Sequence, residues 1–230
     1  MKNIYYLIIF ILLLLSCNSK NNRINIDAYS KISIDSVNFL LDSIMYSLES
    51  GVTKYSDTLL ASVDLTQFPD TTSKGLPCID MKSFFSMIEA IKNKDIENYL
   101  YSFERRSCVD RINYTPYALH MSKSTDNSEV LWTVYLSLSS LNRFRKKELK
   151  PIDNDIHLDE LSKGERDLAI YSLIKSFRKG NKSASFFLAL YFANGIYYFP
   201  KAPLITYKLE SVFYEEMEID YYPGEGMEID

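Results

Sequence analysis

Few side chains in this sequence could act as a nucleophile, a general base or a metal ligand at neutral pH. The chain has two histidines, His120 and His157, and three cysteines. A Ser-His-Asp or Cys-His site would need one of these histidines, yet no serine lies in a Gly-x-Ser-x-Gly sequence. Gly-x-Gly-x-x-Gly and phosphate-loop sequences are absent too. We therefore expect no enzymatic activity and no cofactor.

The strongest candidate for a metal site is the acidic run that begins at Asp153. Asp153 and Asp155 have the Asp-x-Asp spacing of a calcium-binding loop. Such a loop also needs a glycine at its sharp turn and a bidentate glutamate at its end, where this sequence has Leu158 and Gly164. We therefore interpret the run as an acidic linker and predict no bound metal. An enzyme that uses Asp153, Asp155 or His157 is the least favoured function.

The N-terminus predicts where the protein is found. Lys2 precedes an apolar run from Ile4 to Leu15, which has the charge and length of a secretory signal. The run is shorter than the ~20 residues that a spanning helix needs. It ends in Leu14-Leu15-Ser16-Cys17, which resembles the lipobox of bacterial lipoproteins, where the cysteine is diacylated and begins the mature protein. The alternative is an ordinary secretory signal with a chance cysteine.

The lipobox resemblance implies a signal peptide over residues 1–16, a lipid on Cys17 and a polar tether over 17–31. The protein would then be held in the cell envelope by its lipid, at the periplasmic face of the outer membrane. Ser-Cys-Asn at the lipobox resembles lipoproteins of Bacteroidota. So do Asp-Ser/Thr tripeptides such as Asp70-Thr71-Thr72, which are similar to O-glycosylation sites of that group.

The other two cysteines, Cys78 and Cys108, would lie in an oxidising compartment, where an even number of cysteines usually pairs. We favour a disulfide between them, and two buried free thiols are the alternative. The net charge is −4 and becomes one unit more negative when Lys2 is removed. This mild acidity argues against nucleic acid as a partner, because binding to phosphate needs clustered Lys and Arg.

The periodicity of apolar residues predicts an all-α domain over residues 32–216, followed by an acidic tail over 217–230. One helix should carry Val37, Leu41 and Leu48 and end at Gly51. Two more should lie on either side of an Asn93-Lys94-Asp95 turn, and another should follow Asn127. The segment around Trp132 also alternates as a strand would, but its length favours a helix. Ser162 and Glu165 have the spacing of a capping box at the start of a further helix.

The most organised segment lies near the C-terminus. Gly180 and Asn181 form a turn between two predicted helices, and the second helix should end at Asn194-Gly195. Residues of this segment resemble the Sel-like repeat, a relative of the tetratricopeptide repeat, over about 165–207: Gly180, Asn181, Ala184, Leu188, Ala189, Phe192 and Gly195. The sequence departs from the family pattern at Ala189, where glycine is usual, and at Thr206, where alanine is usual.

The resemblance implies two closely packed antiparallel helices with Ala184 and Ala189 at their contact and with Ser185 exposed. Residues 85–95 parallel residues 171–181, which suggests a weaker earlier copy of the unit. One good copy and one poor copy predict an irregular array of helical hairpins. Its expected function is a membrane-anchored, non-enzymatic protein-binding module. The alternative is an immunity lipoprotein that neutralises an antibacterial toxin acting in the periplasm.

Overall fold

The computed structural model describes residues 32–66, 81–105, 113–141 and 158–216. Every regular element in these ranges is an α-helix, and consecutive helices pack as hairpins, so the predicted all-α hairpin array is confirmed. Two compact units contain the described helices. The central unit runs from Met45 to Asn181, and the terminal unit combines the chain up to Ile44 with the chain from Lys182.

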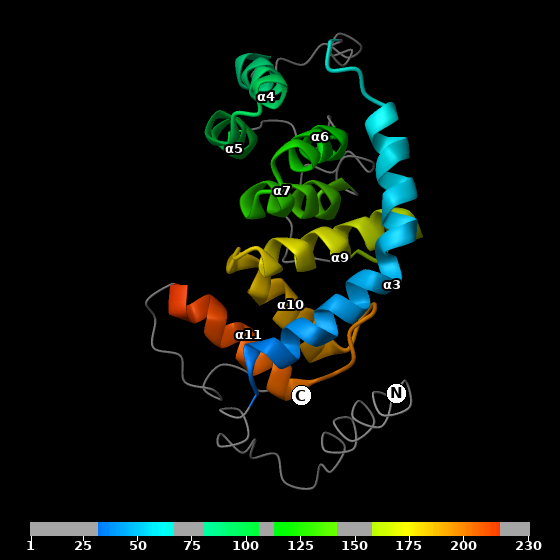
Figure 1. Ribbon diagram of the computed structural model, residues 1–230, viewed down its shortest axis with the longest axis vertical. Coiled ribbons are helices and arrows are strands. Elements are labelled where there is room, and N and C mark those ends of the chain that lie inside the picture. Colours follow the sequence, from blue (N-terminus) through cyan, green and yellow to red (C-terminus); the bar gives the residue numbers. More distant parts are fainter. Residues whose placement is uncertain (1–31, 67–80, 106–112, 142–157, 217–230) are drawn as a thin grey trace, which may run out of the picture. The chain divides into compact units, whose positions relative to one another are not determined.

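The central unit contains two hairpins and a long helix (Figure 1). Helix α4 (Met81–Asn93) packs on α5 (Ile96–Glu104), and α6 (Thr115–Thr125) packs on α7 (Ser128–Ser139). The first hairpin contacts the second through α4 with α6 and through α5 with α7. Helix α9 (Lys163–Arg178) packs on α7 and ends the unit.

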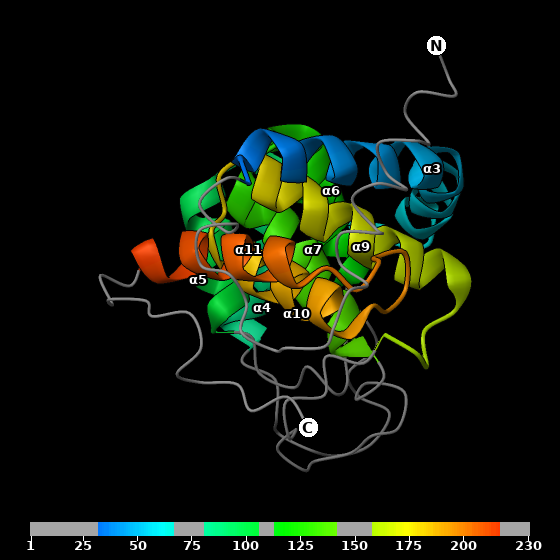
Figure 2. The same ribbon diagram turned by 90° about the horizontal axis from the view of Figure 1, so that it is seen from below.

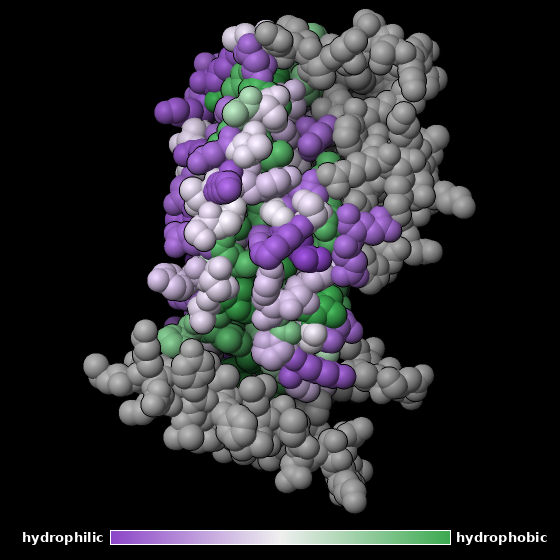
Figure 3. All heavy atoms as spheres, turned by 90° about the vertical axis from the view of Figure 1, so that its right-hand side faces the viewer, coloured by the Kyte–Doolittle hydropathy of each residue, from purple (hydrophilic) through white to green (hydrophobic). Residues whose placement is uncertain are grey.

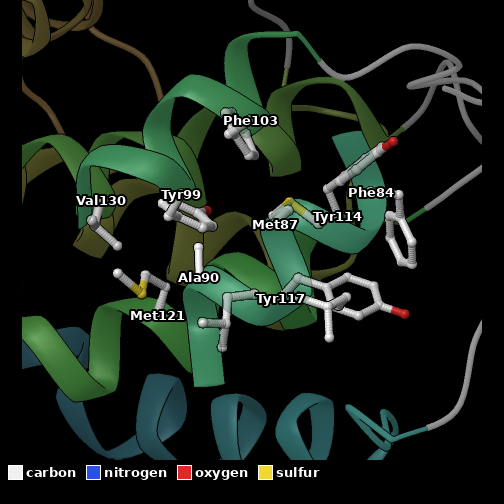
Figure 4. Packing of buried hydrophobic residues seen from close by; sticks show 11 residues of the cluster. Phe84, Met87, Ala90, Tyr99, Phe103, Tyr114, Tyr117, Met121 and Val130 are labelled. Atoms are coloured by element: carbon white, nitrogen blue, oxygen red, sulfur yellow. The ribbon is translucent and has the colours of Figure 1, made fainter. Parts of the chain in front are cut away.

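Aromatic side chains fill the core between the two hairpins (Figure 4). Tyr99 and Phe103 of α5 lie beside Met87 of α4, and the Phe84 ring meets the edge of Tyr117 at 5.3 Å between centroids. The Tyr99 hydroxyl lies 2.7 Å from Thr133 Oγ1, a buried hydrogen bond that joins α5 to α7. Close packing and a satisfied polar group together fix one arrangement of the hairpins.

Helix α3 (Ile34–Ala61) is longer than the sequence predicted. Gly51 was expected to end it, but the helix continues for ten residues beyond that point. Val52 and Ser56 extend the buried stripe of this helix, with 5% and 6% of their surface exposed. Gly51 keeps an ordinary backbone conformation, and a Cβ there would lie 4.0 Å from a carboxylate oxygen of Asp167. Burial of the second half of the stripe therefore outweighs the low helix propensity of glycine.

The second half of α3 belongs to the central unit and approaches the start of α9 at another glycine. A Cβ at Gly164 would lie 2.8 Å from the Tyr55 ring, so only glycine lets this ring pack on the first turn of α9. Ser162 and Glu165 form the predicted capping box of α9, which is confirmed by reciprocal hydrogen bonds between side chain and backbone.

The terminal unit includes α10 (Ser183–Asn194) and α11 (Pro203–Glu216), which run side by side in both ribbon views (Figures 1 and 2). Helix α10 ends at Asn194–Gly195, as predicted, and Gly195 has a left-handed conformation. A Cβ there would lie 3.0 Å from the Lys201 backbone, so the close return of the chain also requires glycine. Phe199 then packs on Phe192 at 5.0 Å between centroids and closes the loop between the helices.

Among the described residues, no helix is both long and apolar enough to cross a membrane.

Candidate functional site

The residues that the sequence marked for chemistry fall largely outside the described ranges. Cys17, Cys78 and Cys108 lie there, as do the acidic run from Asp153 to His157 and the tail over 217–230. The lipid anchor and the disulfide therefore stay predictions. Within the described part of the chain, no group of three or more His, Cys, Asp or Glu residues could hold a metal ion.

The segment that resembles a Sel-like repeat has a left-handed glycine at its turn and buried small and apolar residues on α10. Gly180 has φ +101°, a conformation that L-residues avoid, and it ends α9. The small and apolar positions of α10 are fully buried, with at most 1% of their surface exposed: Ala184, Leu188, Ala189 and Phe192. Helices α9 and α10 belong to different units, so the contact between them stays a prediction.

One expectation for α10 is wrong. Ser185 was expected to be exposed, but none of its surface is accessible, and its hydroxyl donates to the Lys182 carbonyl at 2.6 Å. Serine at this position satisfies its own polar group by bonding back to the preceding turn, which allows it to face the interior. Periodicity alone could not separate this small buried polar residue from a surface serine.

The turn after α9 recurs after α4. The Lys94 N–H donates to the Ile91 carbonyl and the Asp95 N–H to the Ala90 carbonyl, at 3.2 and 2.8 Å. At the end of α9, the N–H groups of Gly180 and Asn181 donate to carbonyls in the same relative positions, at 2.9 and 3.1 Å. Both patterns are Schellman motifs, with a left-handed residue followed by Asp or Asn. The offset of 86 residues seen in the sequence is therefore also an offset of local structure.

The turn between α6 and α7 also ends a helix with a left-handed residue, but through the single hydrogen bond of the αL motif and not through a Schellman motif. Asp126 has φ +47°, its N–H donates to the Ser122 carbonyl, and Asn127 follows it. The Asn127 side chain accepts from the N–H groups at the start of α7, as the Asp95 side chain does for α5. The described chain thus contains three helices that each end in a left-handed residue plus Asp or Asn before the next helix begins. We call these three turns the junctions.

The buried positions of α4 and α5 recur in α9 and α10 at the same offset of 86 residues. Positions of α4 and α5 that are buried have buried counterparts 86 residues later: Phe84, Met87, Ile88, Ala90, Ile91, Tyr99, Ser102 and Phe103. Their counterparts on α9 and α10 include Ser185, which corresponds to Tyr99. Three positions break the register, because they are exposed whereas their counterparts Leu168, Ser172 and Ala184 are buried: Lys82, Ser86 and Asn98. The recurrence of buried positions is therefore partial.

Polar contacts join the turn between α6 and α7 to the C-terminal end of α9. Lys175 and Lys179 both form ion pairs with Asp126, and the Ser176 hydroxyl donates to the Ser128 carbonyl at 2.8 Å. The hydrogen bonds from Lys179 and then Lys175 hold the pKa of Asp126 below its usual value. These contacts set the register of α9 against the second hairpin.

Asn181 adds a further contact to this group. Its side-chain amide donates to Glu129 Oε1 at 2.9 Å, and Asn181 itself is only 3% exposed. The resemblance drew attention to Asn181 as part of a turn, but no local pattern in the sequence indicated its partner on α7. Helix α6 was not predicted either, although Pro116 near its start is a typical helix-initiating signal.

Large hydrophobic side chains are exposed at a few places on the described surface. Tyr46 on α3 is 82% exposed, and Tyr101 on α5 is 54% exposed with the Arg105 guanidinium 4.3 Å above its ring. Figure 3 shows the face on which α3 lies, where hydrophobic residues form narrow strips between hydrophilic ones. Tyr46 and Tyr101 lie on different helices, α3 and α5.

No protein-family model, curated protein or solved structure matches this chain.

Proposed function

We propose that this chain is a membrane-anchored, non-enzymatic protein-binding module of the cell envelope, and that its hairpins are a degenerate Sel-like array. The recurrence of the junction is the observation that carries this proposal. Stacked helical hairpins offer extended surfaces to a peptide or helix of a partner, and they use short turns between helices of each pair. Three helix ends with a left-handed residue followed by Asp or Asn support such an array better than the one good copy and one poor copy that the sequence suggested.

The structure of the junctions favours a rigid binding surface. In the first two, the residue that closes one helix is followed at once by the residue that caps the next, so no free loop separates the paired helices. Ion pairs and hydrogen bonds then fix the second hairpin against α9. A surface that is ordered before binding loses less conformational entropy when the partner arrives.

Site-specific photocrosslinking in the cell envelope tests the proposal. A photoreactive phenylalanine analogue would replace Tyr46 or Tyr101 in the full-length chain, with Lys54 on α3 and Lys92 on α4 as exposed polar control positions. We expect at least one aromatic position to give one discrete protein adduct and the two lysine positions to give none. Absence of an adduct from both aromatic positions, or equal adducts from all four, contradicts the proposal.

The immunity function remains the second candidate, and the acidic balance of the chain favours it. The sequence has 30 acidic against 26 basic residues, a charge that suits a cationic toxin surface. The two candidates differ in the identity of the crosslinked partner. An adduct with a periplasm-acting toxin, together with loss of that toxin's activity in the presence of the chain, would support immunity. An adduct with a resident envelope protein would support the general binding module.

A further inference from the structure

One side of helix α3 carries a row in which acidic and aromatic residues alternate. Asp35, Asp42 and Glu49 lie seven residues apart, and Phe39 and Tyr46 each follow an aspartate by four residues. At 3.6 residues per turn, the five positions fall within an arc of about 80° around the helix axis. They form a row along the blue half of α3 in Figure 1, which we call the α3 stripe. All five belong to one helix, so their placement relative to one another follows from helix geometry alone.

The α3 stripe faces solvent. Its three acidic side chains are exposed, and Phe39 and Tyr46 have 60% and 82% of their surface exposed, the largest fractions among the large hydrophobic side chains of the described residues. The buried side of the same helix, which includes Leu41 and Leu48, lies opposite the stripe. Burial within the fold therefore does not account for these two rings, and exposed apolar side chains aligned in this way are typical of an interaction site.

The charge of the α3 stripe favours a cationic partner. Residues 34–53 contain three acidic residues and no Lys or Arg, and all three acids belong to the stripe. A row of like charges attracts a partner of opposite charge, and it disfavours an acidic protein or an anionic membrane surface.

The chain itself shows how one of its exposed rings binds a cation. On α5, the Arg105 guanidinium lies 4.3 Å from the centroid of the Tyr101 ring. A guanidinium group can stack on a ring and pair with a carboxylate through its planar fork, whereas the ammonium of lysine is a compact point charge. Each ring of the α3 stripe has a carboxylate one turn before it and another one turn after it. Arginine is therefore the side chain that matches both parts of the stripe.

We propose that the α3 stripe binds a helical, arginine-rich segment of the partner protein. This inference rests on the proposed binding function and names the chemistry of the partner. Phe39 and Tyr46 lie about 10 Å apart along the helix axis. A second helix with arginines at every seventh position stays in register with the seven-residue repeat of the stripe. Its guanidinium groups would stack on the two rings and pair with the carboxylates beside them.

Binding of synthetic peptides to the full-length protein in a neutral detergent tests the proposal. The probe is a helical peptide of alanine and glutamine with an arginine at every seventh position, and a matched peptide has lysine at the same positions. We expect fluorescence anisotropy to show several-fold tighter binding of the arginine peptide, because only arginine can both stack and pair through its fork. Equal affinity for the two peptides, or binding of neither, overturns the proposal.

An aromatic substitution tests the contribution of the rings. Tyr46→Leu keeps an apolar side chain and removes the aromatic face, so it should weaken binding of the arginine peptide about threefold. Tyr101→Leu removes an exposed ring from α5, outside the stripe, and should leave the affinity unchanged. An equal effect of the two substitutions contradicts binding at the stripe.

A pair of charge variants tests the contribution of the carboxylates. Asp35→Asn combined with Glu49→Gln removes two charges from the stripe and should weaken binding about fivefold. Glu97→Gln combined with Glu104→Gln removes two charges from exposed positions of α5 and is the matched control, which should bind as the wild type does. An equal loss of affinity in both variants would show that the net charge of the protein, and not the stripe, attracts the peptide.

Failure of this inference is distinguishable from failure of the proposed function. The peptides measure binding at the α3 stripe, whereas photocrosslinking in the envelope measures whether the chain has a protein partner. A discrete adduct in the envelope together with no preference for the arginine peptide would overturn the inference and leave the binding function supported.

Discussion

Glycine has opposite roles at two positions of this chain, although both were expected to end helices. Gly180 has φ +101°, where a side chain is strained whatever the space around it. Gly51 lies inside α3 with ordinary helical geometry and enough room for a methyl group. The difference rests on backbone conformation, which decides whether the absence of Cβ stabilises or destabilises the fold.

Alanine substitutions at these glycines should therefore change stability in opposite directions. We expect Gly180→Ala to lower the free energy of unfolding by about 1–2 kcal/mol, because of its left-handed backbone. Gly51→Ala should raise it by about 0.5–1 kcal/mol, because alanine is the better helix former. Chemical denaturation of the two variants beside wild type measures both effects. A stabilised Gly180→Ala variant would mean that the turn does not hold this conformation.

The first junction provides a second residue-level prediction. Lys94 occupies the place of Gly180 with φ +56° and is exposed on the surface. Lys94→Gly should relieve this strain and stabilise the protein by about 1 kcal/mol. Lys92→Gly, two residues earlier and inside α4, should instead destabilise it by about 1 kcal/mol. If both variants lose stability equally, the turns after α4 and α9 are not equivalent.

At the scale of elements, the ends of each helix depend on residues close in sequence. The position of one helix against another depends on side chains that contact a different helix. The capping box of α9 and the caps of α5 and α7 form between residues close in sequence. The contacts of Asp126 and Asn181 join residues that are about fifty positions apart. Local signals therefore fix where helices begin, while the register between hairpins depends on these distant polar pairs.

The buried small residues of α10 allow a test of its packing. Ala184 is fully buried, so Ala184→Leu should cause overpacking and lower the free energy of unfolding by about 1–3 kcal/mol. Lys182 is exposed and makes no capping bond through its side chain, so Lys182→Leu is the matched control and should change stability by about 0.5 kcal/mol or less. The denaturation midpoints of the two variants measure this difference in stability. Equal midpoints would remove the support for the Sel-like packing of this helix.

At the scale of the whole molecule, the proposal of an envelope protein depends on residues near the N-terminus. Cys17→Ala should leave an unprocessed precursor that takes up no labelled fatty acid, whereas the wild type should be labelled and partition into the detergent phase. Two acyl chains hold a protein on a membrane firmly, and one chain does so only marginally. Normal processing and labelling of the variant would contradict the lipoprotein proposal.

The proposed export also predicts the state of the other two cysteines. Alkylation of the denatured, unreduced mature protein should find no free thiol at Cys78 or Cys108, because a disulfide would join them. After reduction, both should be alkylated. Stoichiometric labelling before reduction would show two free thiols and would remove the proposed constraint on the segment between them.

The sequence by itself determined the helical class, most helix starts and the turns at Asn93–Asp95 and Gly180–Asn181. These features depend on caps, turn residues and the spacing of apolar residues. All of these involve residues that are only a few positions apart in the sequence. Tertiary structure alone decided that α3 passes through Gly51, that Ser185 is buried, and that Asp126 and Asn181 bind residues of other helices. Each of these outcomes depends on a neighbour distant in sequence, because burial and ion pairing are set by the packed partner.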